Sequence, residues 1–196
     1  FVYDFLYPNP ASVLAFIENH DTDRFLGEGN NLPMLKQAST LLLTTRRIPQ
    51  LYYGTEVMMN GVKSKSDGYV RKDFPGGWTG DATNALTPAG RTKIQNECYD
   101  FYKTILNWRK GNDVIAKGSM VQFMVQNGVY AYARQYEGKT IFVMLNGTDA
   151  ETTVPLKFYK EILKDSKQGK DILSGKAITF GEELKMGPRE SLVIEL

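Results

Sequence analysis

The sequence lacks the features that mark several classes of protein. It has a single cysteine, Cys98, so no disulfide can form within the chain. It has no apolar run long enough to cross a bilayer. Its net charge is only +2, and its 24 basic and 22 acidic residues are spread without a basic stripe. We therefore expect neither nucleic acid nor a membrane as a partner.

The chain also begins without a methionine or a secretion signal. Its first residues, Phe1 to Phe5, do not resemble the start of a natural protein, which predicts that the chain is a fragment of a longer one. The sequence leaves open whether that protein is periplasmic or cytoplasmic. Acidic residues do not occur at the spacing of calcium ligands, so we predict no metal site and no cofactor in this segment.

The composition is that of a chain with a packed core. Of 196 residues, 42% are hydrophobic, which suits one or two globular domains and excludes a disordered chain. Residues 1–112 alternate strand-like and helix-like segments, which predicts β/α units around a parallel sheet. Asn31 is a good N-cap for one helix, and Thr87 followed by Pro88 suits the start of another. The expected elements are buried strands at 13–17 and 48–54, helices at 31–45 and 87–110, and a long loop at 56–86.

Residues 113–196 have the pattern of an all-β unit. Short alternating segments are separated by turn residues, and Asn127-Gly128 is a strong hairpin signal. The pattern predicts a small antiparallel β-sandwich. The expected strands are residues 121–125, 129–136, 141–145, 152–155, 160–163, 176–180 and 190–196.

A polar cluster follows the first expected strand. Asn19, His20 and Asp21 come directly after an apolar run, and His20 is the only histidine in the chain. The carboxyl end of a parallel barrel strand is where active sites are built. A carboxylate accepts two hydrogen bonds and an imidazole N–H donates one, so Asp21 and His20 suit the vicinal hydroxyls of a sugar. The alternative is a plain turn, because Asn and Asp favour turns.

Three segments resemble signature regions of the α-amylase family of glycoside hydrolases. Phe16 to Phe25 is similar to the region around Asn-His-Asp at the end of the seventh barrel strand. Ile48 to Glu56 resembles the eighth-strand motif, Pro-x-x-Tyr-Tyr-Gly-x-Glu. Arg71 to Trp78 is similar to the following loop in neopullulanases and cyclomaltodextrinases, closest to Bacteroides-like ones. The resemblance implies the last two β/α units of a TIM (β/α)8 barrel at 1–112, then a C-terminal antiparallel β-sandwich at 113–196.

The resemblance also implies roles for particular side chains. Asp21 corresponds to the catalytic carboxylate that stabilises the transition state, and His20 to a neighbour that hydrogen-bonds the same sugar ring. A wider set is implied to contact an α-glucan oligosaccharide, with bracing, packing or surface ion pairing as the open alternative: Asn19, Arg24, Phe25, Tyr53, Arg71, Asp73 and Trp78.

The chain departs from the family pattern in one respect. A retaining glycosidase needs a nucleophile and a general acid about 5 Å apart, and the motifs that carry them do not occur here. We therefore expect the fragment alone to be inactive and to need the missing barrel portion as a partner, with a homo-oligomer also open. The implied activity is cleavage of α-1,4 links, with α-1,6 links, transglycosylation and calcium in the parent left open. The alternative class is a non-catalytic carbohydrate-binding or scaffold relative.

Overall fold

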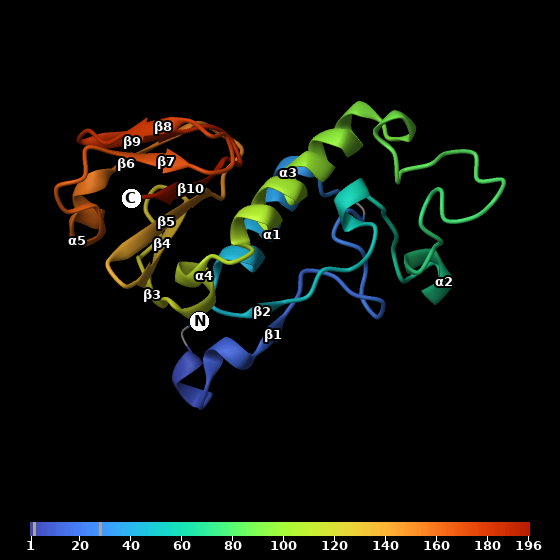
Figure 1. Cartoon of the computed structure of the whole chain (residues 1–196), viewed down its shortest axis with the longest axis horizontal. Coiled ribbons are helices and arrows are strands. Elements are labelled where there is room, and N and C mark those ends of the chain that lie inside the picture. The colour runs from blue at the N-terminus through green and yellow to red at the C-terminus, as the bar shows by residue number, and fades with distance from the viewer. Residues whose placement is uncertain (2, 28) are drawn as a thin grey trace.

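The computed structural model describes residues 1, 3–27 and 29–196 (Figure 1). A β-rich lobe lies at one end, two long helices cross the middle, and irregular segments form the other end. Within the described residues, no helix combines the length and apolar character needed to span a bilayer.

The first part of the chain contains two short parallel strands. β1 (Leu14–Ala15) pairs with β2 (Ile48–Pro49), so the predicted parallel pairing is present but the strands are shorter than expected. The predicted burial is wrong for this chain: Leu14 is 53% exposed and Ile48 is 49% exposed. The reason is that no further strand of the described residues lies beside them. Two strands cannot cover their own apolar surface.

The sequence predicts the start of one long helix correctly and the start of the other incorrectly. α1 (Leu32–Thr44) begins after Asn31, whose side chain accepts a hydrogen bond from the Met34 N–H, as predicted from the cap. The predicted start of the second helix is wrong. A 3-10 turn occupies Pro88–Gly90, and α3 (Lys93–Arg109) begins only after Thr92, which forms a capping box with Gln95. Between β2 and α3 the chain is irregular apart from short turns and α2 (Asp67–Val70).

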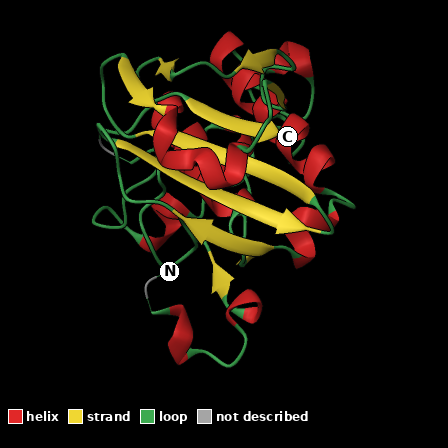
Figure 2. Cartoon of the chain, turned by 90° about the vertical axis from the view of Figure 1, so that its left-hand side faces the viewer, coloured by secondary structure: helices red, strands yellow, loops and turns green. Residues whose placement is uncertain are grey.

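The second part is mainly antiparallel, as predicted. Its large sheet has the strand order β3-β4-β5-β10-β7-β8, and β6 pairs with β9 in a second, two-stranded sheet. Figure 2 shows the strands of this part as yellow arrows facing the viewer. The Asn127-Gly128 turn, with positive φ at both residues, leads into β4 as predicted. The bounds are α4 (Asp113–Lys117), β3 (Ser119–Gln122), β4 (Val129–Tyr136), β5 (Lys139–Asn146), β6 (Thr152–Pro155), β7 (Gln168–Asp171), β8 (Ala177–Thr179), β9 (Glu183–Met186) and β10 (Ser191–Glu195).

Three features of this part differ from the sequence prediction. Residues 160–163 form a helix, α5 (Lys160–Leu163), because Ile162 and Leu163 are both buried and do not alternate across a sheet. The strands β7 and β9 were not predicted, since both are short and rich in charged or small residues. The first strand lies at Ser119–Gln122 rather than at 121–125.

The large sheet is buried on both faces. One face, including Tyr132, Val143 and Val193, packs against a cluster that includes Leu35 and Ile105 of the long helices. The opposite face packs against the small sheet and α5, in a second cluster. The sheet therefore anchors the helices that carry the loops at the other end of the molecule.

Candidate functional site

The loop after β1 is shaped by the side chain of Asn19. Its Oδ1 accepts a hydrogen bond from the Asp21 N–H at 2.8 Å, and its own N–H donates to the Thr22 hydroxyl at 3.0 Å. This is the turn that Asn and Asp favour. Asn19 therefore braces the loop, and the loop presents the next two side chains outward.

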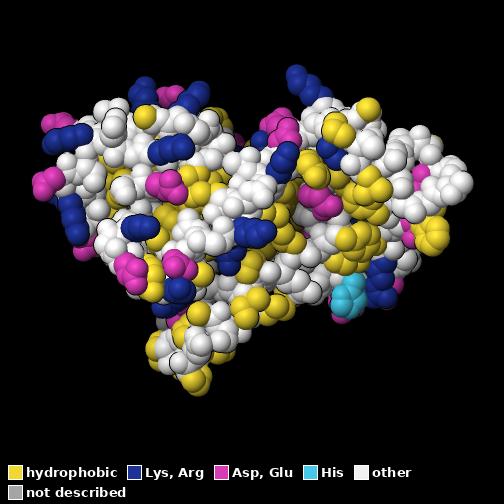
Figure 3. Space-filling view, in the orientation of Figure 1, with side chains coloured by type: hydrophobic (Ala, Val, Ile, Leu, Met, Phe, Trp, Pro, Cys, Tyr) yellow, Lys and Arg dark blue, Asp and Glu magenta, His cyan; other side chains and the backbone are white. Residues whose placement is uncertain are grey.

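His20 and Asp21 lie side by side on the surface. The His20 Nε2 is 3.1 Å from the Asp21 Oδ2, and both side chains are 58% exposed. In Figure 3 the one histidine lies at the surface among basic and acidic side chains. The pair therefore points to solvent rather than into apolar interior.

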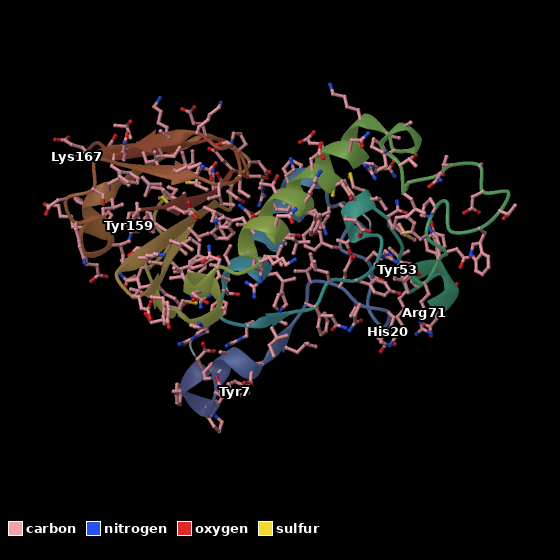
Figure 4. All side chains as sticks on the ribbon, viewed as in Figure 1. Tyr7, His20, Tyr53, Arg71, Tyr159 and Lys167 are labelled. Atoms are coloured by element: carbon pink, nitrogen blue, oxygen red, sulfur yellow. The ribbon has the colours of Figure 1, made fainter. Side chains whose placement is uncertain are left out.

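Arg71, which follows α2, reaches back to this pair. Its Nε donates to the His20 carbonyl at 3.0 Å, and its NH2 group donates to the Asp21 Oδ1 at 3.2 Å. Figure 4 shows His20, Arg71 and Tyr53 at the same end of the molecule. Arg71 therefore lies beside the Asn-His-Asp loop and forms a surface ion pair with Asp21, the alternative that the sequence left open for it.

Two further residues complete the charged cluster and were not predicted. Lys63 Nζ donates to the Asp21 carbonyl at 2.9 Å and lies 3.7 Å from Asp67. The Asp67 carboxylate is 3.2 Å from the same Arg71 nitrogen that contacts Asp21. Lys63, Asp67 and Arg71 are four residues apart each time, which is a signal for ion pairs among themselves but not for their position beside Asp21. Asp21 thus shares its cation with a second carboxylate.

Arg24 lies beneath the loop and is only 1% exposed. Its guanidinium donates to the Tyr53 carbonyl at 2.7 Å and to the Val70 carbonyl at 3.0 Å. The rings of Tyr52 and Tyr53 lie 4.2 and 4.8 Å from its central carbon. This placement fits bracing, the alternative to sugar contact that the sequence left open for Arg24: a buried guanidinium held by carbonyls joins the β1 loop to the β2 loop.

A buried carboxylate, Glu18, supports the same loop. It accepts hydrogen bonds from the Phe25 N–H and from the Thr55 hydroxyl, and it lies 3.6 Å from the Arg24 guanidinium. Burying a charge is costly unless it is paired and hydrogen-bonded, and here both conditions are met. The sequence signal was an acidic residue directly after the apolar run that ends at Ile17.

The predicted aromatic contacts fall in different places. Tyr53 is partly exposed, and its hydroxyl donates to the Lys72 carbonyl at 2.5 Å, which holds the loop after β2 in place. Phe25 is partly buried and packs against the helix–sheet core, the alternative to sugar contact that the sequence left open for it. Trp78 is 67% exposed, and its main-chain N–H donates to the Asp81 carboxylate at 3.1 Å.

The remaining predicted residue, Asp73, is exposed on the loop after β2. No hydrogen bond or ion pair of its side chain is found among the described residues. Within the described residues, no group of three His, Cys, Asp or Glu side chains could hold a metal ion.

The phenol of Tyr52 lies beside Arg24. Burial raises the pKa of Tyr52, so this phenol stays neutral near pH 7.

The structure therefore brings together Asn19, His20, Asp21 and Arg71, and it adds Lys63 and Asp67. Tyr53 instead contacts Arg24 and the Lys72 carbonyl. An exposed imidazole, a carboxylate and a guanidinium can together donate to and accept from the hydroxyls of one sugar ring. Since Asp21 keeps its Oδ atoms at the surface, a ligand can reach them.

Comparison with known proteins gives the family. The profile of the cyclo-malto-dextrinase C-terminal domain matches residues 120–195. The chain is 30% identical to an α-amylase of Niallia circulans over 176 residues, covering 86% of this chain and 29% of that protein. It is 31% identical to a cyclomaltodextrin glucanotransferase of Thermoanaerobacterium thermosulfurigenes, covering 82% of this chain and 21% of that protein.

The fold has close counterparts among solved structures. The α-amylase of Geobacillus thermoleovorans, in its complex with acarbose, superposes with a TM-score of 0.76 at 23% identity, over 99% of this chain and 41% of that one. The chain spans less than a third of the length of the two curated relatives named above. The chain belongs to the α-amylase family of glycoside hydrolases and corresponds to the C-terminal part of its members.

Proposed function

We propose that this chain is the C-terminal segment of a retaining α-glucan hydrolase of the neopullulanase or cyclomaltodextrinase type. Its parent would cleave α-1,4 links of starch-derived oligosaccharides. Release of maltotriose from pullulan would identify α-1,6 cleavage in addition. The match of residues 120–195 to the cyclo-malto-dextrinase C-terminal domain supports this branch.

The observation that carries the proposal is the exposed His20–Asp21 pair held by Arg71. In this proposal Asp21 accepts hydrogen bonds from the 2- and 3-hydroxyls of the sugar at the cleaved bond, and His20 donates to the same ring. An interaction that strengthens as the ring approaches an oxocarbenium ion lowers the barrier to reaction. Arg71 orients the Asp21 carboxylate by donating a hydrogen bond to its Oδ1.

The proposal includes a partner, namely further barrel strands of the same protein. The exposed side chains of Leu14 and Ile48 on β1 and β2 support it, because buried barrel strands carry apolar residues on both faces. That partner would supply the nucleophile and the general acid. By this proposal the chain of 196 residues does not hydrolyse maltotriose or pullulan by itself.

The experiment compares Asp21→Asn with Asp100→Asn in the full-length protein, using maltotriose and pullulan as substrates. Asp100 is an exposed carboxylate on α3 and serves as the matched control. We expect Asp21→Asn to lower kcat by roughly a hundredfold or more while KM changes little, because the lost contact acts in the transition state. An unchanged kcat would refute the role of Asp21.

A second candidate is transglycosylation, in which a sugar hydroxyl replaces water as the acceptor. It is favoured by the glucanotransferase names of relatives such as the protein of Thermoanaerobacterium thermosulfurigenes. Products longer than the substrate, formed from maltotriose by the full-length protein, would identify transglycosylation.

A third candidate is a non-catalytic carbohydrate-binding relative. It would bind these glucans without forming any product, although such a scaffold has no need for an Asn-His-Asp trio.

A further inference from the structure

The β-rich lobe carries a lysine-lined pocket of about 570 Å³. One wall is formed by residues 155–167, which run from β6 through α5, and the other by residues 180–183, between β8 and β9. Figure 4 labels Lys167 at this end of the molecule, opposite His20. The pocket is thus separate from the charged cluster described above.

Four lysines line this pocket: Lys157, Lys160, Lys164 and Lys167. Among the described residues, the lysines in ion pairs are others: Lys36, Lys63, Lys117 and Lys185. Lys157 lies over the ring of Phe158, whereas no side-chain partner is found for the remaining three within the described chain. The acidic side chains on the opposite wall are Glu182 and Glu183, and neither pairs with these lysines. Three ammonium groups around one cavity therefore have no side-chain partner among the described residues and can bind an anion.

The backbone at Lys164 adds an independent observation. This residue has φ 48° and ψ −122°, and the Ser166 N–H donates to the Leu163 carbonyl at 2.9 Å. These values are close to the first central position of a type II′ turn, which favours glycine. A lysine at this position is strained, and strain of this kind is concentrated at functional positions.

The pocket is also partly apolar. Leu156 and Leu163 are buried in its floor, and Phe180 lies half-buried in its wall. Its volume is that of a small organic molecule rather than of a single inorganic anion. The lining thus combines cations for an anionic group with an aromatic ring for an uncharged body.

We propose that this pocket binds the phosphate ester of a phosphorylated sugar. A phosphate dianion offers several acceptor oxygens, so it can take hydrogen bonds from Lys160, Lys164 and Lys167 together. The sugar body would rest against Phe180, since the C–H face of a sugar ring packs on an aromatic ring. This site is independent of catalysis at Asp21.

The test is calorimetric titration of the 196-residue chain with three probes: glucose 6-phosphate, inorganic phosphate and glucose. We expect glucose 6-phosphate to bind most tightly, inorganic phosphate more weakly, and glucose not measurably. Added salt should weaken the binding, because the interaction is electrostatic. Inorganic phosphate binding as tightly as the ester would overturn the sugar-phosphate assignment, and so would glucose binding equally well.

Variants separate the pocket from general charge. Lys160→Ala/Lys167→Ala should weaken glucose 6-phosphate binding by roughly tenfold, whereas Lys170→Ala/Lys176→Ala, which removes the same charge outside the pocket, should leave it unchanged. Lys164→Gly relieves the strained turn, so it should raise the melting temperature while weakening binding. Loss of binding in a more stable protein cannot come from misfolding. Equal affinity in Lys160→Ala/Lys167→Ala and in its control would refute the proposal.

Discussion

The guanidinium of Arg134 in β4 donates a hydrogen bond to the main-chain carbonyl of Thr44, 90 residues earlier in the sequence, at 2.9 Å. Thr44 is the last residue of α1, where carbonyls lack partners within the helix and carry partial negative charge. The same guanidinium donates to the carbonyls of Ile115 and Gly118, around the end of α4. One buried side chain therefore ties two helix ends to the large sheet.

We predict that Arg134→Met lowers the free energy of unfolding by about 3 kcal/mol, because buried carbonyls would lose their donors. Burial lowers the pKa of Arg134 to about 10, so the group is still a cation near pH 7. Urea denaturation followed by circular dichroism measures the change. Lys139→Met, at an exposed position of β5, is the control and should change stability by less than about 0.5 kcal/mol. Equal stability of the two variants would show that the carbonyls find other partners.

Acid should release the N-terminal segment from the end of α1. The buried carboxylate of Asp4 is hydrogen-bonded to Arg46 at 2.7 Å and to Arg47. Burial acts to raise the pKa of Asp4, but the hydrogen bonds and charges of Arg47 and Arg46 outweigh it, so the pKa lies below its usual value of 3.8. The stabilisation is therefore complete above the unfolded pKa and is lost as pH falls through the folded one.

Hydrogen exchange of the segment from residue 3 to residue 12 measures this effect. The ratio of exchange rates between Asp4→Asn and the unchanged chain, taken at the same pH, should be large near pH 6 and should fall towards one below pH 3.8. Asp113→Asn is the control, because its partner Lys117 is exposed and lies in another part of the chain. A ratio that is independent of pH would contradict the role of the Asp4 carboxylate.

Cys98 should be chemically silent in the folded chain. Its side chain is fully buried on α3, and the thiol lies 3.6 Å from the Thr55 carbonyl. Burial raises the pKa of this thiol to about 12, so almost none of it is the reactive thiolate near pH 8. We expect a thiol reagent such as a maleimide to label it only through unfolding, at least about a hundredfold more slowly than in 8 M urea. Comparable rates in the two conditions would mean that α3 opens readily.

Local signals predicted some elements of this fold and long-range contacts decided others. The start of α1 follows from Asn31, and the hairpin follows from Asn127-Gly128, because a cap or a tight turn is set by two or three neighbouring residues. The start of α3 was misplaced because Thr87 and Thr92 are both good caps, and only the first has Pro88 after it. The position of β10 between β5 and β7 depends on pairing across the whole sandwich.

In the candidate site too, local features could be predicted from the sequence and long-range contacts could not. The Asn19 turn and the exposure of His20 and Asp21 are local, and the sequence indicated both of them. The sequence left both bracing and sugar contact open for Arg24, because its contact with the Val70 carbonyl, 46 residues away, is not a local feature. Lys63 and Asp67 were missed since nothing nearby in the sequence brings their loop to Asp21. Residue type and spacing therefore suggest a site, whereas the tertiary contacts decide which members face a ligand.

The last prediction concerns Arg71, which we expect to position Asp21 rather than to stabilise the fold. Its ion pair with Asp21 is exposed, and such pairs contribute little to stability, so Arg71→Ala should change the free energy of unfolding by less than about 0.5 kcal/mol. Losing the hydrogen bonds to Asp21 and to the His20 carbonyl frees the loop that carries both groups. In the full-length protein we therefore expect kcat/KM for maltotriose to fall by roughly tenfold.

The matched control for Arg71→Ala is Lys117→Ala, which removes a cation from another exposed pair, Lys117–Asp113, at 3.1 Å. Arg71→Lys distinguishes charge from geometry, because an ammonium restores the charge but cannot reach the two acceptors through separate nitrogens. If Arg71→Lys restores full activity, charge alone is sufficient. If Arg71→Ala and Lys117→Ala are equally active, Arg71 does not position Asp21. The contact of Arg71 with the Asn-His-Asp loop then has no role in activity.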